Sequence, residues 1–488
     1  DFNVDGKTDL SVGANIYSSN AGRAYIFYND GSIPTSAASA DIIITGEASS
    51  YFGYSMAVGD FNADGKTDLA IGAYGYATNV GRVYIYETRD DFAWQLPSYS
   101  TGMRVNNLAG DELKITGESS GGYFGGGTPT AGDFNSDGRV DLAVGAYYAN
   151  GSGKIYIFYN DGSISNSAAL ADVIITGEAS SRFGVSIAAG DFNSDGRMDL
   201  AVGGDYYITQ TGRTYIFYND GSYPTEAASA DAIITGTATT DRFGQVLAAG
   251  DFNSDGRTDL AVGAPLYGSN NGRAYIFYND GSYPAAAIDA DIQIAAEGIN
   301  DYFAIKIAVG DLDSDGIDDL IIGAYYYNSY TGRAYIFYND GSIPTLAADA
   351  NAIITGEGTL NNFGTNLACS DFNSDGRTDL IVSAPQYATY TGRAYIFYND
   401  GSIPTSAADA DVIITGESIY NNFSSSFAIG DFNSDGRADL AVGAIRYNTY
   451  TGRAYIFYND GSIPALAADA DVILEGETTD SNFGSLGV

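Results

Sequence analysis

Residues 251–264, DFNSDGRTDLAVGA, decide the fold, because near-copies of this stretch recur along the whole chain. The other copies begin at Asp1, Asp60, Asp133, Asp191, Asp311, Asp371 and Asp431. Successive copies lie about 60 residues apart, a period typical of repeat architectures. The chain is therefore one repeat domain, and not the roughly three domains that its length alone would suggest.

Each repeat contains four short apolar segments rich in β-forming residues. In the fifth repeat they are RFGQVLAAG from Arg242, DLAVGA from Asp259, GRAYIFYN from Gly272 and ADIQIAA from Ala290. Turn-forming Gly, Asn and Asp residues separate them. We expect four antiparallel strands, named A to D in chain order, and no helix. An alanine-rich segment before strand D is expected to act as a spacer.

Eight four-stranded units fit a β-propeller better than an open solenoid, because radial repetition protects the sheet edges. The first repeat begins at the loop that follows strand A, whereas NFGSLGV from Asn482 supplies an extra strand A. We therefore predict an all-β fold over residues 1–488, a single eight-bladed β-propeller of four-stranded blades. It is closed by pairing of the C-terminal strand with the first blade, and residues 87–107 form an insertion in the second repeat.

Composition excludes several classes of function. Lys+Arg number 22 against 61 Asp+Glu, and the resulting net charge of −39 makes nucleic acid or an anionic membrane surface an improbable partner. The chain has no histidine, which removes Ser/His/Asp catalysis and histidine zinc sites. The one cysteine, Cys369, permits no internal disulfide. No run of 18 apolar residues occurs, so we expect no direct membrane insertion.

The loop between strands A and B carries oxygen-bearing side chains at alternate positions. We call it the acidic loop and number its positions from the first Asp. Asp or Asn at positions 1, 3, 5 and 9, with the position-7 carbonyl, would give Ca²⁺ the six or seven oxygen ligands that it prefers. Glycine at position 6 allows a sharp turn. Position 12 is Val or Ile where an EF-hand has Glu, so a calcium-binding β-hairpin loop is predicted.

The predicted cofactor is structural Ca²⁺, up to eight ions. The alternative is a set of ordinary Asx turns with solvated carboxylates, but such clusters would repel themselves without a cation. Asp313 replaces Asn in the sixth loop, and its extra charge predicts the tightest site. The predicted ligands are Asp1, Asn3, Asp5, Asp9, Asp60, Asn62, Asp64, Asp68, Asp133, Asn135, Asp137, Asp141, Asp191, Asn193, Asp195, Asp199, Asp251, Asn253, Asp255, Asp259, Asp311, Asp313, Asp315, Asp319, Asp371, Asn373, Asp375, Asp379, Asp431, Asn433, Asp435 and Asp439.

These motifs resemble the FG-GAP repeats of integrin α-subunit propellers and of many bacterial surface proteins. The resemblance rests on the Phe-Gly pair that opens strand A, the acidic loop, and Gly-Ala-Pro at residues 263–265. It implies calcium on one face and a partner-binding face opposite, built from the B-to-C and D-to-A loops. It further implies a recognition or assembly module outside the cytoplasm. Two repeats depart by losing the glycine, at Ala304 and Ser424, and eight repeats exceed the seven blades usual in integrins.

Tyrosines dominate the B-to-C loops. We expect the first tyrosine of each loop to pack between blades, and a second set, Tyr330, Tyr390 and Tyr450, to be exposed for partner binding. Trp94, the sole tryptophan, makes the insertion a further candidate contact.

The first functional hypothesis is a non-enzymatic extracellular or cell-surface propeller for adhesion or structural assembly. Its partner would be a protein or a glycan, and self-assembly into a polymer is a further expectation. The alternatives are a lectin that uses the tyrosine-rich loops and, less favoured, a polysaccharide lyase.

Overall fold

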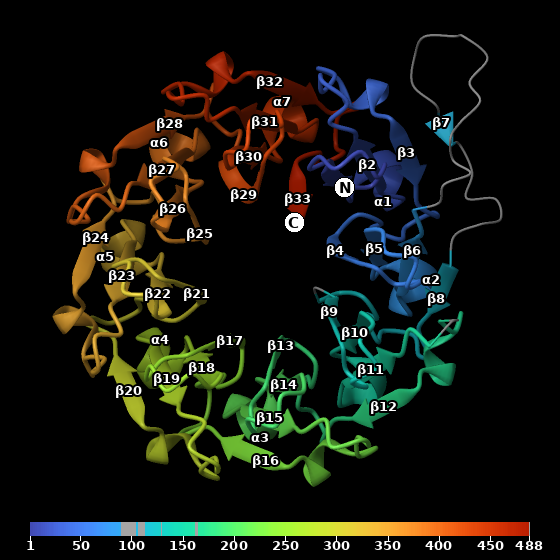
Figure 1. Cartoon of the computed structure of the whole chain (residues 1–488), viewed down its shortest axis with the longest axis vertical. Coiled ribbons are helices and arrows are strands. Elements are labelled where there is room, and N and C mark those ends of the chain that lie inside the picture. Colours follow the sequence, from blue (N-terminus) through green and yellow to red (C-terminus); the bar gives the residue numbers. More distant parts are fainter. Residues whose placement is uncertain (89–103, 106–112, 128, 162–163, 488) are drawn as a thin grey trace.

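A computed structural model describes residues 1–488 except 89–103, 106–112, 128, 162–163 and 488. Eight antiparallel sheets are arranged in a ring around a central axis (Figure 1), which confirms the predicted eight-bladed β-propeller. Strand A of each blade lies nearest the axis and strand D forms the outer wall. Blades are numbered here by their strand B in chain order.

The strands occupy equivalent places in the eight blades. Strand A is β33 (Ser485–Gly487), β4 (Ser55–Gly59), β9 (Thr130–Gly132), β13 (Ile187–Gly190), β17 (Val246–Gly250), β21 (Lys306–Gly310), β25 (Leu367–Ser370) and β29 (Phe423–Gly430). Strand B is β1 (Leu10–Ala14), β5 (Asp68–Ala73), β10 (Asp141–Ala146), β14 (Asp199–Gly204), β18 (Asp259–Ala264), β22 (Asp319–Ala324), β26 (Asp379–Ala384) and β30 (Asp439–Ala444).

The outer two strands follow the same pattern. Strand C is β2 (Arg23–Phe27), β6 (Arg82–Tyr86), β11 (Lys154–Phe158), β15 (Arg213–Phe217), β19 (Arg273–Phe277), β23 (Arg333–Phe337), β27 (Arg393–Phe397) and β31 (Arg453–Phe457). Strand D is β3 (Ile42–Thr45), β8 (Leu113–Thr116), β12 (Val173–Thr176), β16 (Ala232–Thr235), β20 (Ile292–Ala295), β24 (Ala352–Thr355), β28 (Val412–Thr415) and β32 (Val472–Glu475). A two-residue strand from the insertion, β7 (Arg104–Val105), pairs in parallel with β3.

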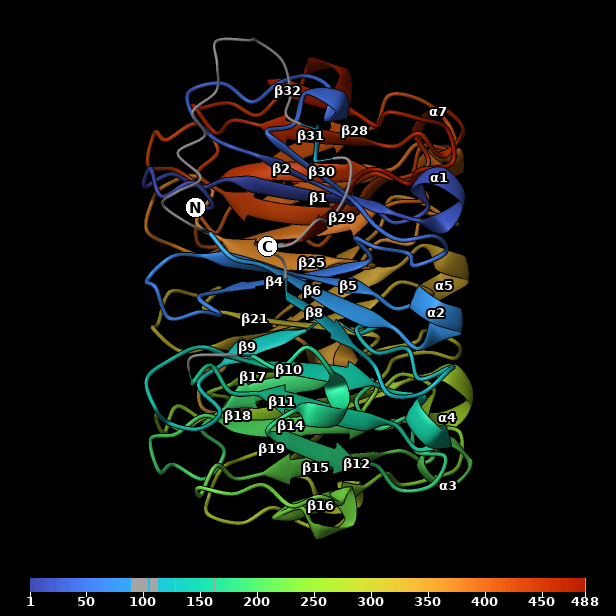
Figure 2. The same cartoon turned by 90° about the vertical axis from the view of Figure 1, so that its right-hand side faces the viewer.

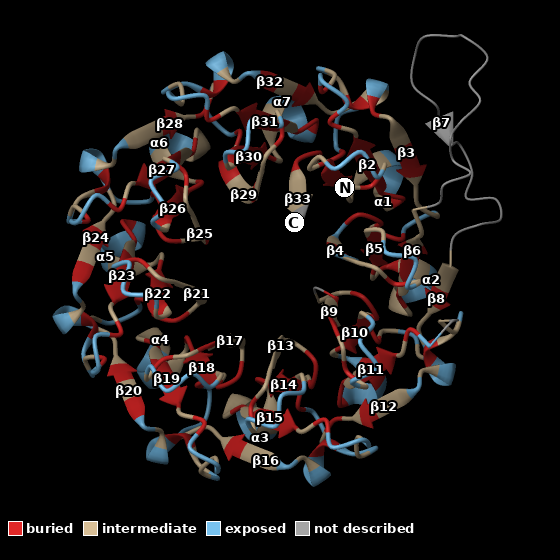
Figure 3. Cartoon of the chain, viewed as in Figure 1, coloured by how far each residue is buried: buried red, intermediate tan, exposed pale blue. Residues whose placement is uncertain are grey.

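The hydrophobic core lies between neighbouring blades. All six residues of β18 are buried, because its two faces pack against blades 4 and 6, and its sequence is accordingly apolar after Asp259. The phenylalanine of the Phe-Gly pair is buried in this core: the Phe243 ring meets the edge of Tyr275 at 5.3 Å and 81°. Figure 3 shows the buried residues inside the blades and the exposed ones at the loops.

Close approach of blades 5 and 6 requires glycine at position 263 of strand B. A Cβ atom on Gly263 would lie 2.4 Å from the carbonyl oxygen of Ala304 in the next blade. No side chain fits at that distance, so the small residue sets how tightly two blades pack.

The ring is closed by its C-terminal strand, as predicted. Strand β33 pairs antiparallel with β1, with Val12 opposite Leu486. Phe483 is buried and packs edge-on against Tyr25 at 5.1 Å, just as the other phenylalanines do in their own blades. The last residues of the chain therefore complete the first blade.

The expectation of no helix was wrong for short turns. The B-to-C loops contain α1 (Tyr17–Asn20), α2 (Tyr76–Asn79), α3 (Tyr207–Gln210), α4 (Tyr267–Asn270), α5 (Tyr327–Tyr330), α6 (Tyr387–Tyr390) and α7 (Tyr447–Tyr450), with η3 (Ala149–Gly151) in blade 3. The alanine-rich segments form the 3-10 turns η1 (Ala37–Ser39), η4 (Ala168–Leu170), η5 (Ala227–Ser229), η6 (Ala287–Asp289), η7 (Ala347–Asp349), η8 (Ala407–Asp409) and η9 (Ala467–Asp469). The α1 to α7 turns contain left-handed residues, such as Asn328 with φ 45°, so they are tight turns and not regular helices.

The ring has two distinct faces. Seen from the side, α1, α2 and α5 lie at one edge, whereas the N-terminus, which starts the first acidic loop, lies toward the other edge (Figure 2). The acidic loops follow strand A and the B-to-C turns follow strand B, and antiparallel strands place these two sets at opposite ends. We call these ends the acidic face and the tyrosine face.

Candidate functional site

The side chains at positions 1, 3 and 5 of each acidic loop converge on the backbone of the same loop. In the fifth loop Asp251 Oδ2 accepts a hydrogen bond from Gly256 N at 2.8 Å, and Asn253 Oδ1 accepts one from Asp255 N at 3.0 Å. Asp255 Oδ1 accepts one from Arg257 N at 3.0 Å. The same three contacts recur in all eight loops. The loop thus presents its oxygen atoms as one cluster.

Position 9 has a different environment from positions 1, 3 and 5. Asp259 is fully buried, its Oδ2 accepts from Phe252 N at 2.9 Å, and its Oδ1 accepts from Asn279 N at 2.7 Å. It therefore ties the acidic loop to the turn after strand C. The sequence carried a signal for this tie, because a YND or YN motif follows nearly every strand C. In blade 2 Thr88 N makes the equivalent bond to Asp68.

Burial raises the pKa of the position-9 carboxyls. The pKa reaches about 7 in Asp199 and Asp259 and about 6 in Asp141 and Asp439, although two backbone N–H bonds to each carboxylate oppose the shift. A charged carboxylate held in such a place lacks a nearby positive partner. A cation bound in the loop would supply one.

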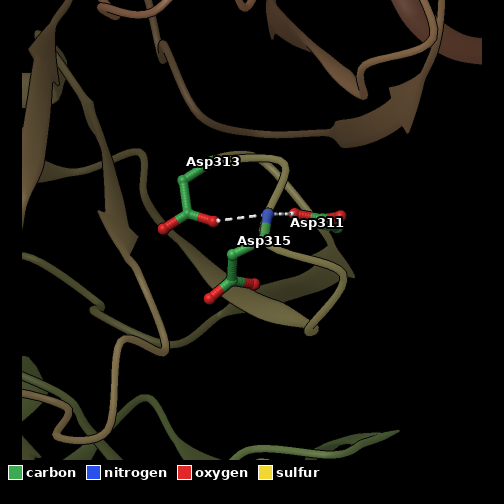
Figure 4. Close-up of side chains that lie close together, drawn as sticks. All are labelled: Asp311, Asp313 and Asp315. Carbon is green, nitrogen blue, oxygen red and sulfur yellow. Dashed lines mark hydrogen bonds between the residues drawn. The ribbon is translucent and has the colours of Figure 1, made fainter.

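The sixth loop has the densest acidic cluster. Carboxylate oxygens of Asp311, Asp313 and Asp315 all lie within 4.8 Å of one another (Figure 4). Partial burial and the neighbouring Asp315 raise the pKa of Asp313. Among the described residues, this loop alone brings three carboxylates so close, since Asn occupies position 3 in the other seven.

Neighbouring acidic loops are also connected to each other. Asn279, whose backbone holds Asp259, donates from Nδ2 to the carbonyl oxygen of Asp191 at 3.1 Å and to Ser194 Oγ at 3.1 Å in the preceding blade's loop. Asn339 reaches Asp251 O in the same way at 2.9 Å. Such bonds link neighbouring acidic loops in these blades, whereas the equivalent Asn459 of blade 8 donates to Ala438 O in its own loop.

The donor set fits a hard cation. Carboxylate and amide oxygens at positions 1, 3 and 5 are the ligand type that Ca²⁺ prefers. Each oxygen of Asp259 accepts one N–H, which leaves a second lone pair, whereas Oδ2 of Asp319 and Oδ2 of Asp379 each accept two. Glycine at position 6 adopts φ 79° in Gly256, as the predicted sharp turn requires.

The tyrosine face holds a repeated contact that sequence reasoning described only as packing. The first tyrosine of the B-to-C turn stacks under the arginine that opens strand C: the Arg333 guanidinium lies 3.9 Å from the ring centroid of Tyr327. The same arginine bridges to the preceding blade through Glu297 at 2.6 Å. The other junctions of this kind are Arg23 with Glu477, Arg82 with Glu47, Lys154 with Glu118, Arg213 with Glu178, Arg393 with Glu357 and Arg453 with Glu417.

One junction lacks this ion pair. Between blades 4 and 5 the acidic position is Thr237, which instead donates to Asp241 Oδ2 at 3.0 Å. The facing Arg273 still stacks on Tyr267 at 3.9 Å, and it bonds Gln293 at 3.0 Å.

The second tyrosine set is partly exposed, and its role in partner binding stays a prediction. Tyr330 is 38% and Tyr450 42% exposed, and Tyr390 is intermediate. Tyr330 leans on Tyr326, with ring centroids 4.4 Å apart. Trp94, in the insertion, lies outside the described residues.

The fold and its loops define an eight-bladed β-propeller assembled from FG-GAP-type units. The FG-GAP repeat model matches residues 52–86, 243–277, 303–337, 363–397 and 423–457, and the FG-GAP-like repeat model matches residues 133–202. The chain belongs to the FG-GAP repeat family.

Curated relatives share part of this propeller. The mouse (Mus musculus) phosphatidylinositol-glycan-specific phospholipase D is 36% identical over 155 residues, 30% of this chain and 18% of that protein. Integrin alpha-PS2 of Drosophila melanogaster is 31% identical over 265 residues, 51% of this chain and 17% of that protein. The matches thus span less than a fifth of either relative. A solved structure titled as the eukaryotic initiation factor aligns over 99% of this chain and 98% of that chain, at 12% identity and a TM-score of 0.44.

No helix among the described residues has the length and apolar character needed to cross a membrane.

Proposed function

We propose that the chain is a non-catalytic interaction scaffold that Ca²⁺ stabilises and that works outside the cell or at its surface. The observation that carries this proposal is the eightfold repetition of one oxygen-rich loop geometry on a single face. Side chains at positions 1, 3 and 5, the position-7 carbonyl and the position-9 carboxylate would hold each ion. Ca²⁺ would supply positive charge beside buried carboxylates such as Asp259.

Extracellular calcium levels suit such loops. At a dissociation constant near 10⁻⁴ M and about 1 mM Ca²⁺, each site would add about 1.4 kcal/mol, and eight independent sites on the order of 11 kcal/mol. Eight divalent ions would offset less than half of the net charge of −39. The loaded propeller would therefore stay acidic and soluble.

Adhesion or surface assembly is supported by the relatives and by the design of the ring. An integrin α-subunit shares half of the chain at 31% identity. The chain has no histidine, which removes the commonest general base. Every blade repeats the same scaffold, while the tyrosine face offers half-exposed aromatic side chains of the kind that interfaces use.

Thermal unfolding in EDTA tests the calcium part of this proposal. Chelation is expected to lower the melting temperature steeply, and added Ca²⁺ is expected to restore it. Mg²⁺ is expected to restore it poorly, because Mg²⁺ demands a tighter octahedral shell. An unchanged melting curve, with metal removal confirmed by elemental analysis, would contradict the proposal.

The non-catalytic part has its own test. Acidic and neutral polysaccharides and a phosphatidylinositol-glycan substrate are incubated with the calcium-loaded protein, and products are followed by chromatography. We expect no cleavage. Turnover that disappears on heat denaturation would show an enzyme.

A further inference from the structure

The residue before each strand-A phenylalanine has a left-handed backbone in all eight blades, with φ between 52° and 57°. In chain order these residues are Tyr51, Tyr123, Arg182, Arg242, Tyr302, Asn362, Asn422 and Asn482. Asparagine adopts this conformation readily, whereas other L-residues pay about 1 to 2 kcal/mol. Three blades show that asparagine satisfies the fold. The other five blades have a large aromatic or cationic side chain at this position, although the left-handed backbone disfavours such residues. This choice indicates a role other than folding.

Four of these side chains belong to one continuous row on the tyrosine face. Tyr74 stacks on Tyr51 at 4.9 Å and on Tyr123 at 5.8 Å, and Tyr123 stacks on Tyr147 at 5.7 Å. The row continues through Arg182, which lies 5.4 Å from the Tyr147 centroid. We call this row the tyrosine–arginine arc. It consists of Tyr51, Tyr74, Tyr123, Tyr147, Arg182, Tyr206 and Arg242, with the Tyr206 ring between the two arginines.

Stacking determines what the arc can offer a ligand. Both ring faces of Tyr74 are occupied by its neighbours, at interplanar angles of 17° and 19°. The ring edges and the phenol hydroxyl groups therefore remain for contact. The hydroxyls of Tyr51 and Tyr123 already accept from Asn20 Nδ2 at 3.0 Å and Asn79 Nδ2 at 3.3 Å, and each still has its O–H to donate. Ring edges carry partial positive charge and hydroxyl groups both donate and accept, so the arc favours an electron-rich, hydroxyl-bearing partner.

The arc ends in a cationic cluster at blades 4 and 5. Arg182 lies 4.4 Å from the Tyr206 ring centroid, and Arg242 Nη2 donates to the Tyr206 hydroxyl at 2.9 Å. Beneath them Asp205, whose side chain is 0% exposed, accepts from Arg182 at 3.4 Å. Two guanidinium groups against one carboxylate leave a local excess of positive charge in a chain of net charge −39.

The hydrogen bonding of this cluster is incomplete. Among the described residues, Arg182 Nε, Arg242 Nε and Asp205 Oδ1 are buried without a partner, and so is Gln245 Oε1, three residues after Arg242. Buried polar atoms without partners are costly, and a native protein keeps few of them. The cluster is held in place from below by Asp205 and lacks hydrogen-bond partners for both donors and acceptors.

We propose that the tyrosine–arginine arc binds an acidic polysaccharide. Uronate carboxylates pair with the Arg182 and Arg242 guanidinium groups, whose planar fork matches a carboxylate, and the sugar hydroxyls bond the row of phenol hydroxyls. A polysaccharide that carries both hydroxyl and carboxylate groups can bond to the tyrosines and to the arginines of the arc. An acidic peptide would meet only the arginines. This inference rests on the proposed interaction role but not on calcium.

The overall charge of the protein does not prevent this binding. The acidic loops that carry much of the negative charge lie on the opposite face. At physiological salt the Debye length is about 8 Å, so charges across the disc are screened from a ligand on the arc.

Natural variation within the ring supplies the test variant. Asn482 and Asn15 occupy the places of Arg182 and Asp205 at the junction of blades 8 and 1. The triple variant Arg182→Asn, Asp205→Asn, Arg242→Asn therefore installs residues that the fold already accepts and leaves no buried charge. Arg446→Asn is the matched control, because Arg446 stacks on Tyr390 and Tyr450 outside the arc.

Calorimetric titration at 0.15 M salt uses a hyaluronan octasaccharide and a trigalacturonate as probes. Chitin hexasaccharide is the neutral sugar control and octa-aspartate the acidic peptide control. We expect both uronate probes to bind, at least tenfold weaker binding to the triple variant, and unchanged binding to Arg446→Asn. Neither control ligand should bind comparably.

Each contrary outcome overturns the inference. These outcomes are no binding of either uronate probe, equal binding by the triple variant, equal binding of chitin, and tighter binding of octa-aspartate, which would indicate an acidic protein partner. Melting curves with and without EDTA are recorded on the same samples. If melting depends on calcium but neither uronate probe binds, the inference of an acidic-polysaccharide site is wrong. The proposal of a calcium-stabilised scaffold is then still supported.

Discussion

The acidic face and the tyrosine face of the ring differ in how strictly they repeat. On the acidic face all eight loops keep the same residues at positions 1, 3, 5, 6 and 9, apart from Asp313, and the same three hydrogen bonds within the loop. On the tyrosine face a cation–Glu ion pair recurs at every junction except that of blades 4 and 5, whereas the left-handed residue before the strand-A phenylalanine is Tyr, Arg or Asn in different blades. Strict repetition indicates that the acidic loop has the same structural role in every blade. Side chains that vary while the backbone conformation stays the same indicate positions at which individual blades differ in function.

The largest expected effect concerns position 9 of the acidic face. Asp259→Ala leaves the buried N–H groups of Phe252 and Asn279 without acceptors and opens a small void, so we expect a loss of about 3 to 4 kcal/mol in the free energy of unfolding. Urea denaturation in EDTA measures it. Asp255→Ala, at an exposed position of the same loop, is the control and should cost much less without calcium. Equal losses would mean that Asp259 does not tie the acidic loop to the turn after strand C.

The next effect concerns the repeated part of the tyrosine face. Glu297→Thr reproduces the blade 4–5 junction at the blade 5–6 junction and leaves Arg333, which is largely buried, without its ion pair. We expect a loss of about 1 to 2 kcal/mol, more than for an exposed pair. Thermal unfolding at low and high salt measures it. A loss that disappears at high salt would show that the Arg333–Glu297 pair behaves like an exposed surface ion pair.

The reverse change should stabilise the ring. Thr237→Glu places a carboxylate opposite Arg273, and Asp301 beside Glu297 shows that a second nearby acid is tolerated. We expect a gain of about 0.5 to 1 kcal/mol, because the pair is only partly buried. The double variant Thr237→Glu, Arg273→Gln is the control and should lose the gain. A destabilised single variant would show that the bond from Thr237 to Asp241 matters more than the missing pair.

The smallest effect on stability is expected from the second tyrosine set. Replacing Tyr330, Tyr390 and Tyr450 with Ser should change the free energy of unfolding by less than about 0.5 kcal/mol for each residue, because the side chains are half-exposed. Tyr327→Ser, which removes the ring under Arg333, is the control and should cost more. A large loss of stability in the triple variant would show that these tyrosines stabilise the fold by packing.

Much of the architecture was accessible to sequence reasoning. The 60-residue period, the closure by residues near Phe483 and the turn at Gly256 followed from repetition and from turn chemistry. The predicted calcium ligands remain predictions, and the structure shows that position 9 already accepts two backbone bonds. The short turns of the B-to-C loops were missed, because left-handed Asn, Ser and Thr residues leave no helical periodicity in the sequence.

The sequence by itself determined the number of blades, the strand pattern and the place of the acidic loops, because each depends on local spacing that recurs in every repeat. Only the tertiary structure decided which residues meet across blades. Arg333 and Glu297, or Tyr74 and Tyr123, lie tens of residues apart, and their contact depends on how far one blade rotates relative to the next. The physical reason is that the core lies between blades, so the side chains that distinguish one junction from another acquire their neighbours only when the ring closes.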